Sequence, residues 1–165
     1  MSASYFRTLI GYSRWAWSKV LDQVAQLTPE QYESRQFNFG SVRSTLTHIS
    51  GVEAIYLARV SGQPPVPRRH EDEFPTFAAL RERWEQQFEQ QKEFGATLSD
   101  DVLGQTFDYV GPSGPASSRR DLFLAQMINH STQHRAETAM AVTEFGHSPG
   151  DLDVSLYIRE AGPSA

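Results

Sequence analysis

The 165-residue chain contains no cysteine. Disulfide bonds and thiolate metal sites are therefore excluded, and the protein has no thiol of its own that could act as a nucleophile. Any metal ion must be held by histidine, aspartate or glutamate. A chain of this length buries roughly 70% of the surface that its unfolded form exposes, so that it can form a core without a disulfide or structural metal.

The sequence also has no long apolar run and no excess of positive charge. No stretch approaches the about 18 uninterrupted apolar residues of a membrane span, and Arg7 and Arg14 interrupt the apolar residues near the N-terminus that a secretory signal would need. Lysine and arginine number 15 against 20 aspartate and glutamate residues, which is unlike a nucleic-acid-binding protein. We expect a cytoplasmic protein with a single domain over residues 1–165, which binds neither nucleic acid nor membranes.

Two common catalytic motifs are absent as well. The sequence has no glycine-rich loop that could cradle a phosphate and no glycine-flanked serine that could act as a nucleophile. The pattern therefore disfavours nucleotide-binding enzymes and serine hydrolases.

Apolar residues recur at spacings of three and four along most of the chain, which predicts amphipathic helices. Four long helices are expected over residues 6–27, 41–62, 76–98 and 118–146. Ser118, followed three residues later by Asp121, predicts a capping box at the start of the fourth helix. The sequence therefore indicates an all-α fold, and the similar helix lengths favour a four-helix bundle over a looser orthogonal packing.

Shorter features connect the long helices. Residues 63–75 are rich in proline and charge and indicate a crossover loop. Residues 106–110 alternate in polarity before a Gly-Pro-Ser-Gly-Pro turn, which is compatible with a small hairpin before the fourth helix. A short C-terminal helical segment is expected from Val154 to about Glu160.

His130 and His134 form the sharpest chemical pattern in the sequence. They lie one helical turn apart, so that both imidazoles project from the same face and can meet one metal ion. On a helical wheel they share a sector with Phe123 and Met127. Burial of two imidazoles beside apolar side chains is costly unless their nitrogens find partners, and a shared metal ion would be such a partner.

His48 is a third candidate ligand, on the second predicted helix. It lies beside Val52 and Ile55 at the edge of the apolar arc. Metal sites in bundles are built from side chains on facing helices, and three converging histidines would leave coordination positions open for water or substrate. The alternative is a histidine at the edge of the core that is hydrogen-bonded to a carbonyl or hydroxyl group.

Three stretches of the sequence resemble the DinB family, also described as DinB/YfiT-like, which is distinct from the DNA polymerase of the same name. They read FGSVRSTLTHISGVEAIYLARVSGQP, DEFPTFAALRERW and NHSTQHRAE, and a final segment has Asp153 and Tyr157 in a related spacing. The resemblance extends from about residue 9 to residue 157. It implies a four-helix bundle with up-down-down-up connectivity, commonly a homodimer, with a divalent metal ion between the second and fourth helices.

The resemblance also implies the site residues. The metal ligands would be His48, His130 and His134. The family often has glutamine where this chain has Glu137. Glu137 lies one turn beyond His134, so that it is expected to orient a ligand, to act as a base on metal-bound water, or to form a surface pair. Orientation of a ligand is the favoured role.

Several functions are compatible with this resemblance. Characterised relatives include bacillithiol transferases and a mycothiol-dependent isomerase, which implies a metal-dependent S-transferase that uses a low-molecular-weight thiol. A metal-dependent hydrolase with Glu137 or, less favourably, Glu53 as base is an alternative. Two further alternatives are a non-catalytic, stress-associated metal-binding protein and a metal-free bundle. Three imidazoles accept zinc, nickel, copper, iron or cobalt, and the sequence does not choose among them.

Overall fold

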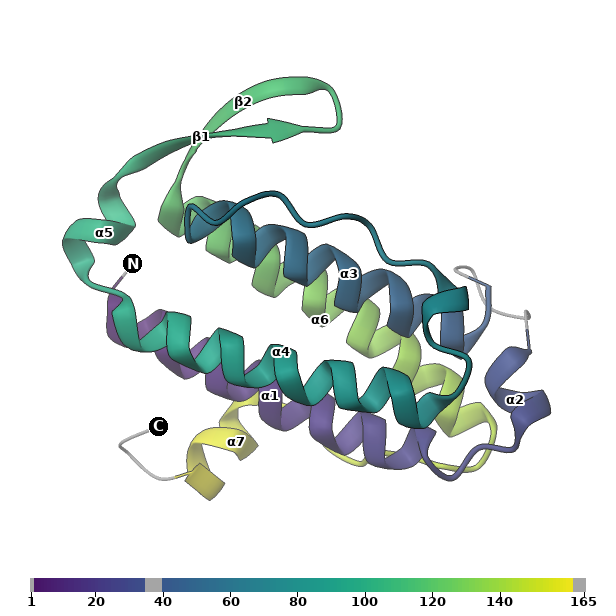
Figure 1. Ribbon diagram of the computed structural model, residues 1–165. Helices are drawn as coiled ribbons and strands as arrows, with labels where there is room; N and C mark the ends of the chain where they lie inside the picture. Colours follow the sequence, from purple (N-terminus) through teal and green to yellow (C-terminus); the bar gives the residue numbers. More distant parts are fainter. Residues whose placement is uncertain (1, 35–39, 162–165) are drawn as a thin grey trace.

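The computed structural model describes residues 2–34 and 40–161 of the chain (Figure 1). Helices dominate these residues, and the prediction of a mainly helical protein is confirmed. The elements are α1 (Ala3–Val24), α2 (Pro29–Glu33), α3 (Val42–Val60), the 3-10 helix η1 (Glu71–Glu73), α4 (Phe77–Thr97), α5 (Asp100–Gly104), β1 (Thr106–Gly111), β2 (Gly114–Arg119), α6 (Arg120–Glu144) and α7 (Val154–Ala161).

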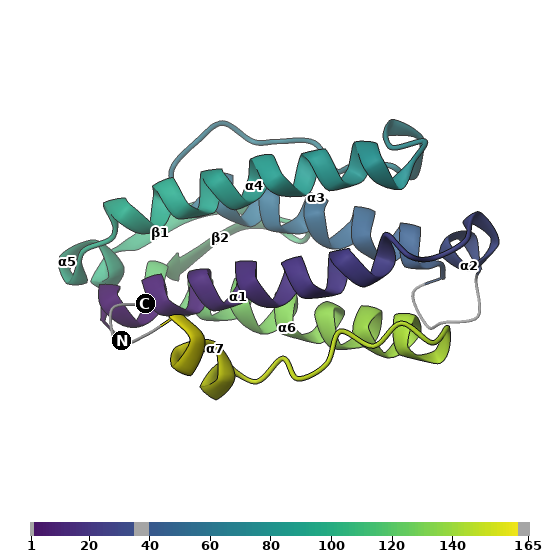
Figure 2. The same cartoon turned by 90° about the horizontal axis from the view of Figure 1, so that it is seen from below.

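The four long helices α1, α3, α4 and α6 lie side by side (Figures 1 and 2). Helix α1 packs against α4 and α6, and α3 packs against the same two helices. Helices α3 and α4 run in the same direction, because the segment between them returns along the length of the molecule before α4 begins (Figure 1). The crossover predicted from residues 63–75 is therefore present, and it contains η1. This arrangement places α3 beside α6, where the predicted metal ligands lie.

The apolar faces of these helices form two hydrophobic clusters. Trp17 and Trp84 are completely buried in the larger cluster, with ring centroids 4.6 Å apart. Phe6 and Leu124 are buried in the second cluster, which packs against residues of the hairpin. None of the helices in the described part of the chain combines the length and the apolar character that a membrane crossing requires.

The starts of two helices agree with the sequence, whereas the start of α6 does not. Ser41 and Thr76 accept hydrogen bonds from backbone N–H groups in the first turns of α3 and α4. The predicted capping box of Ser118 and Asp121 is wrong, because Ser118 belongs to strand β2 and its hydroxyl donates to the carbonyl of Arg119. The Asp121 carboxylate instead accepts hydrogen bonds from the Arg119 guanidinium, at 2.6 and 3.1 Å.

The small hairpin and the C-terminal helix are both present. Strands β1 and β2 pair in antiparallel register around the turn between Gly111 and Gly114. The hairpin lies over one end of the molecule, between α5 and α6 (Figure 1). Helix α7 packs against α1, where the Tyr157 ring lies 6.0 Å from that of Tyr12. The hairpin thus stands near the N-terminal half of α6, which carries His130.

Candidate metal centre

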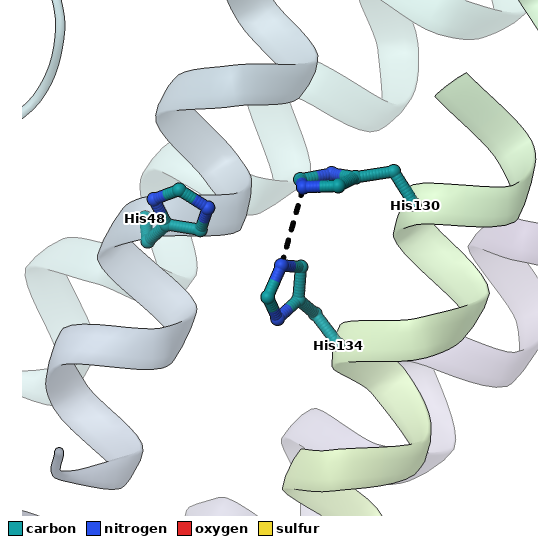
Figure 3. A group of neighbouring side chains, drawn as sticks. All are labelled: His48, His130 and His134. Atoms are coloured by element: carbon teal, nitrogen blue, oxygen red, sulfur yellow. Dashed lines mark hydrogen bonds between the residues drawn. The ribbon is translucent and has the colours of Figure 1, made fainter. Parts of the chain in front are cut away.

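The three predicted histidines converge between α3 and α6. His48 projects from the middle of α3, and His130 and His134 project from consecutive turns of α6, with all three rings directed toward one another (Figure 3). One nitrogen atom from each ring lies within 4.8 Å of the other two. The ring centroids are separated by 4.5 Å for the α6 pair and by 5.1 and 5.7 Å for the pairs that include His48. The group could therefore hold a metal ion.

The spacing of the two α6 histidines suits a common metal ion. Their Nε2 atoms are 3.2 Å apart. Two nitrogen ligands at 2.0–2.1 Å from a tetrahedral ion lie about 3.3 Å from each other. Three neutral imidazoles form a donor set that suits zinc and the late first-row transition metals, so that the residues fit the group that the sequence implies.

Glu137 contacts the most deeply buried of the three histidines. Its Oε2 atom lies 2.7 Å from Nδ1 of His134, which is 2% exposed. A carboxylate only accepts hydrogen bonds, so the Nδ1 atom carries the proton and the Nε2 atom keeps its lone pair. The other Glu137 oxygen accepts a hydrogen bond from the Gln133 side chain. The contact with His134 is the arrangement expected of a carboxylate that orients a ligand.

Burial keeps the other two histidines in the neutral form that binds metals. The pKa of His130 is lowered to about 4, mainly by burial and further by the neighbouring charges of His134 and His48. The pKa of His48 is lowered by burial and by the charges of His134 and Arg68. The negative charge of Glu137 acts in the opposite direction on the pKa of both His48 and His130. In addition, the buried Nδ1 atom of His130 has no hydrogen-bond partner within residues 2–34 and 40–161. An unsatisfied buried nitrogen is costly, and such groups are found at functional sites.

A large cavity meets the histidines from one side. Its volume is about 950 Å³, which is in the range of pockets for small molecules, and both His48 and His130 line it. The other walls are α3, the first part of the crossover loop and the hairpin. His134 does not line the cavity and stands behind the other two ligands. A molecule in the cavity can therefore reach a metal ion at the site from the side of His48 and His130.

The remaining histidines and the second candidate base lie elsewhere. His70 is exposed in the crossover loop, and His147 follows the end of α6. Glu53 faces away from the histidines, as the helical wheel predicts, and its Oε2 atom accepts hydrogen bonds from Gln87 and Gln91 at 2.9 and 2.6 Å. Glu53 is therefore a core residue, and among the described residues it has no contact through which it could serve as a base at the metal centre.

Sequence reasoning missed the polar network to which Glu53 belongs. Glu53, Gln87, Gln91, Ser131 and Arg135 are all buried. Ser131 accepts a hydrogen bond from the indole of Trp17, and Arg135 donates to Tyr12 and Ser13. We call the five buried residues together the Glu53 network. Two glutamines four residues apart on the apolar side of α4 were a signal in the sequence that could have revealed it.

Burial raises the pKa of Glu53. The loss of solvent is the largest cause, and hydrogen bonds from Ser131, Gln91 and Gln87 together with the charge of Arg135 lower the pKa in part. Burial likewise lowers the pKa of Arg135, while Tyr12 and Glu53 favour its charged form. The network therefore holds two ionisable groups in the core through hydrogen bonds.

A comparison with protein families identifies the family of this chain. The comparison with curated proteins gives no match. The model of the DinB family matches residues 1–165. A mainly helical chain that brings His48, His130 and His134 together from two facing helices, and that matches this model along its whole length, belongs to the DinB family.

Proposed function

We propose that this protein binds a divalent transition-metal ion through His48, His130 and His134 and catalyses the transfer of a low-molecular-weight thiol to an electrophile. The observation that carries the proposal is the convergence of three imidazoles at the inner side of a cavity of about 950 Å³. A structural metal site is normally closed by four protein ligands, whereas a site for chemistry keeps an open position. Three histidines beside a cavity fit the second kind.

The absence of cysteine defines how sulfur chemistry could proceed. The sulfur must come from a diffusible thiol, because the chain has none. A bound divalent metal ion would supply Lewis acidity, which favours the thiolate form of a thiol at neutral pH. In the transfer, the sulfur forms a bond to an electrophilic carbon, and the bond from that carbon to its leaving group breaks. The leaving group keeps the electron pair, and the thiol proton passes to the solvent.

The residues of the chain have separate roles in this proposal. The three histidines hold the ion, and Glu137 keeps the His134 ring in the tautomer whose Nε2 atom carries the lone pair that would bind the ion. The walls of the cavity orient the thiol and the electrophile. Because Glu137 is engaged with His134, we assign it to orientation of the ligand rather than to proton transfer.

Metal analysis tests the first half of the proposal. Wild-type protein that has never been exposed to a nickel column should carry close to one equivalent of a single transition metal. His48→Ala and His134→Ala should carry little, whereas His70→Ala, which removes an exposed histidine, should match the wild type. Equal and negligible metal in all four proteins would refute the metal site.

A thiol-consumption assay tests the second half. Metal-bound wild type is offered chlorodinitrobenzene and a panel of thiols that includes bacillithiol, mycothiol and glutathione. Consumption of one thiol above the uncatalysed rate, with loss of that rate in His134→Ala but not in His70→Ala, is the expected result. If metal binds and no thiol is consumed, the transfer is refuted. A broad hydrolase panel then distinguishes a metal-dependent hydrolase from a non-catalytic metal-binding protein.

We also infer that α1, α3, α4 and α6 form an up-down-down-up bundle that acts as a cytoplasmic homodimer. The parallel course of α3 and α4 supports the connectivity (Figure 1). Leu122 and Met140 support an interface, because both are 56% exposed and lie five turns apart on one face of α6. Sedimentation should give twice the monomer mass for the wild type and a lower mass for Met140→Glu.

A further inference from the structure

The cavity beside the histidines has a charge pattern that the metal centre does not explain. Arg59 and Arg68 line it, and Asp108 is the acidic residue in its wall. The walls therefore carry a net positive charge before any metal ion is added, although the chain as a whole has a formal net charge of -5. A local excess of positive charge in a negatively charged protein favours a negatively charged ligand.

Arg59 is already engaged in the protein. Its Nη2 atom donates a hydrogen bond to the carbonyl of Val110 at 2.7 Å, and its guanidinium lies 5.4 Å from the centre of the Tyr109 ring. These contacts join α3 to the hairpin across the cavity. Arg59 thus positions the hairpin as a wall of the cavity.

Arg68 is not engaged in this way. Its side chain is exposed, and within the described residues it makes neither a hydrogen bond nor an ion pair. It stands on the crossover loop and lines both the large cavity and a smaller adjoining one, each of which also includes His48. Arg68 is therefore available to bind an anionic group of a molecule that reaches the metal centre.

Apolar side chains also line the cavity. Val66 on the crossover loop is 37% exposed and Val110 on the hairpin is 69% exposed, and both line the cavity. Tyr56 lies beside the metal centre, with its ring 5.9 Å from that of His130. Exposed valines on two walls of one cavity form a surface that an apolar part of a ligand would cover.

We propose that the cavity selects a thiol with a carboxylate-bearing tail: the sulfur lies at the metal centre, the middle of the molecule lies against Val66 and Val110, and the carboxylate pairs with Arg68. This inference rests on the proposed function, and it adds the class of substrate. A guanidinium is suited to a carboxylate because it can donate two parallel hydrogen bonds to it.

Binding of matched thiols to cobalt-substituted protein tests this selection. Mercaptohexanoate, mercaptohexanol and aminohexanethiol share one carbon chain and differ in the charge of the terminal group. Each is titrated into the Co²⁺ protein, and the charge-transfer absorption between thiolate and cobalt reports binding. We expect mercaptohexanoate to bind roughly fivefold to tenfold more tightly than mercaptohexanol, and aminohexanethiol to bind least tightly. The preference should decrease as the salt concentration rises.

Variants assign the preference to particular side chains. Arg68→Gln should remove most of the preference for mercaptohexanoate while its Co²⁺ affinity stays at the wild-type value, and Arg68→Lys should keep part of the preference. Val110→Ser should weaken the binding of mercaptohexanoate and of mercaptohexanol to the same degree. Arg14→Gln is the matched control, because Arg14 is an exposed arginine of α1 that pairs with Glu89.

The outcomes separate this inference from the proposed function. If thiols alter the cobalt spectrum but bind equally well, or if Arg68→Gln keeps the full preference, the selection by Arg68 is wrong and thiol binding at the metal stands. If Co²⁺ does not bind, or if no thiol alters its spectrum, the proposed function fails and this inference fails with it.

Discussion

Two groups of polar side chains lie among the long helices, and they differ in their number of hydrogen bonds and in their access to a cavity. In the Glu53 network, the Arg135 guanidinium has three hydroxyl acceptors and the Oε2 atom of Glu53 has two amide donors, whereas its Oε1 atom has no hydrogen-bond partner in the described part of the chain. In the histidine cluster, the rings face one another, and the buried Nδ1 atom of His130 has no hydrogen-bond partner in the described part of the chain. The network is sealed in the core, whereas the cluster meets a cavity.

This difference indicates which group maintains the fold and which group serves the ligand. Buried polar groups that are joined by several hydrogen bonds fix a unique packing, and the loss of one partner leaves the others unsatisfied. Polar side chains that line a cavity are instead available to a ligand. We therefore expect substitutions in the network to change the stability of the protein, and substitutions in the cluster to change metal binding.

The largest effect is expected from Arg135→Ala. Arg135 is 2% exposed, and its removal leaves a void and leaves the buried Glu53 without its nearby positive charge. The free energy of unfolding should fall by about 3 kcal/mol in urea denaturation without metal. Arg14→Ala, which removes an exposed ion pair, should cost less than about 1 kcal/mol. Equal, small effects of the two substitutions would show that the network does not stabilise the core.

The next effect concerns stabilisation by metal. Free metal at about 100 times its dissociation constant should raise the unfolding free energy of the wild type by about 2.7 kcal/mol, because the ion binds the folded state. His48→Ala should lose this gain and change the stability without metal by less than about 1 kcal/mol, since His48 is only half-buried. His70→Ala should keep the full gain. A gain in His48→Ala as large as in the wild type would place the ion elsewhere.

A smaller change in metal affinity is expected from Glu137→Ala. The carboxylate fixes the tautomer of His134, so the metal affinity should fall by about 10–100-fold when it is removed. Competition with a chromophoric chelator measures the affinity. Glu144→Ala, which removes an exposed carboxylate at the end of the same helix, should retain the wild-type affinity. If the two variants behave alike, the contact between Glu137 and His134 has no role in holding the ion.

The smallest effect is expected from Glu53→Gln, and it appears as a pH dependence. The pKa of Glu53 is raised in the folded state, so that the folded protein keeps a proton that the unfolded chain releases above its ordinary pKa of about 4.5. The unfolding free energy of the wild type should therefore fall as the pH rises from that value through the raised pKa. Glu53→Gln should lose this slope and differ from the wild type by less than about 1 kcal/mol at pH 5.

The difference in slope between the variant and the wild type isolates the contribution of Glu53, because the two proteins share all their histidines. Glu144→Gln is the control and should keep the wild-type slope, because Glu144 is exposed. A Glu53→Gln protein with an unchanged slope would contradict the raised pKa.

The helices and the histidine cluster could be predicted from local patterns. The spacing of apolar residues located the four long helices to within a few residues. The spacing of His130 and His134 placed two imidazoles on the same face of one helix, one turn apart. The wheel also placed His48 at the edge of its apolar arc. These features depend on residues that are close in the sequence, which is why a sequence pattern can predict them. The family resemblance added that the two helices face each other.

Features that depend on distant residues could not be predicted. A wheel shows that Glu53 points away from His48, but it does not show that Gln87 and Gln91 of another helix meet it. The start of α6 was misplaced because strand β2 extends to Arg119 only through its pairing with β1. The cavity depends on how the crossover loop and the hairpin are held over α3. One such contact, between Arg59 and Val110, joins residues 51 positions apart.

The hairpin supplies Asp108, Tyr109 and Val110 to the cavity and none of the three histidines. It is fastened by the hydrogen bond from Arg59 to the carbonyl of Val110 and by the Arg120 guanidinium, which lies 5.1 Å from the centre of the Phe107 ring. The candidate metal ligands are thus on the long helices, whereas part of the cavity wall is on a separate element. Such a division lets evolution alter the accepted ligand by exchanging a short hairpin, while the helices that carry the histidines stay the same.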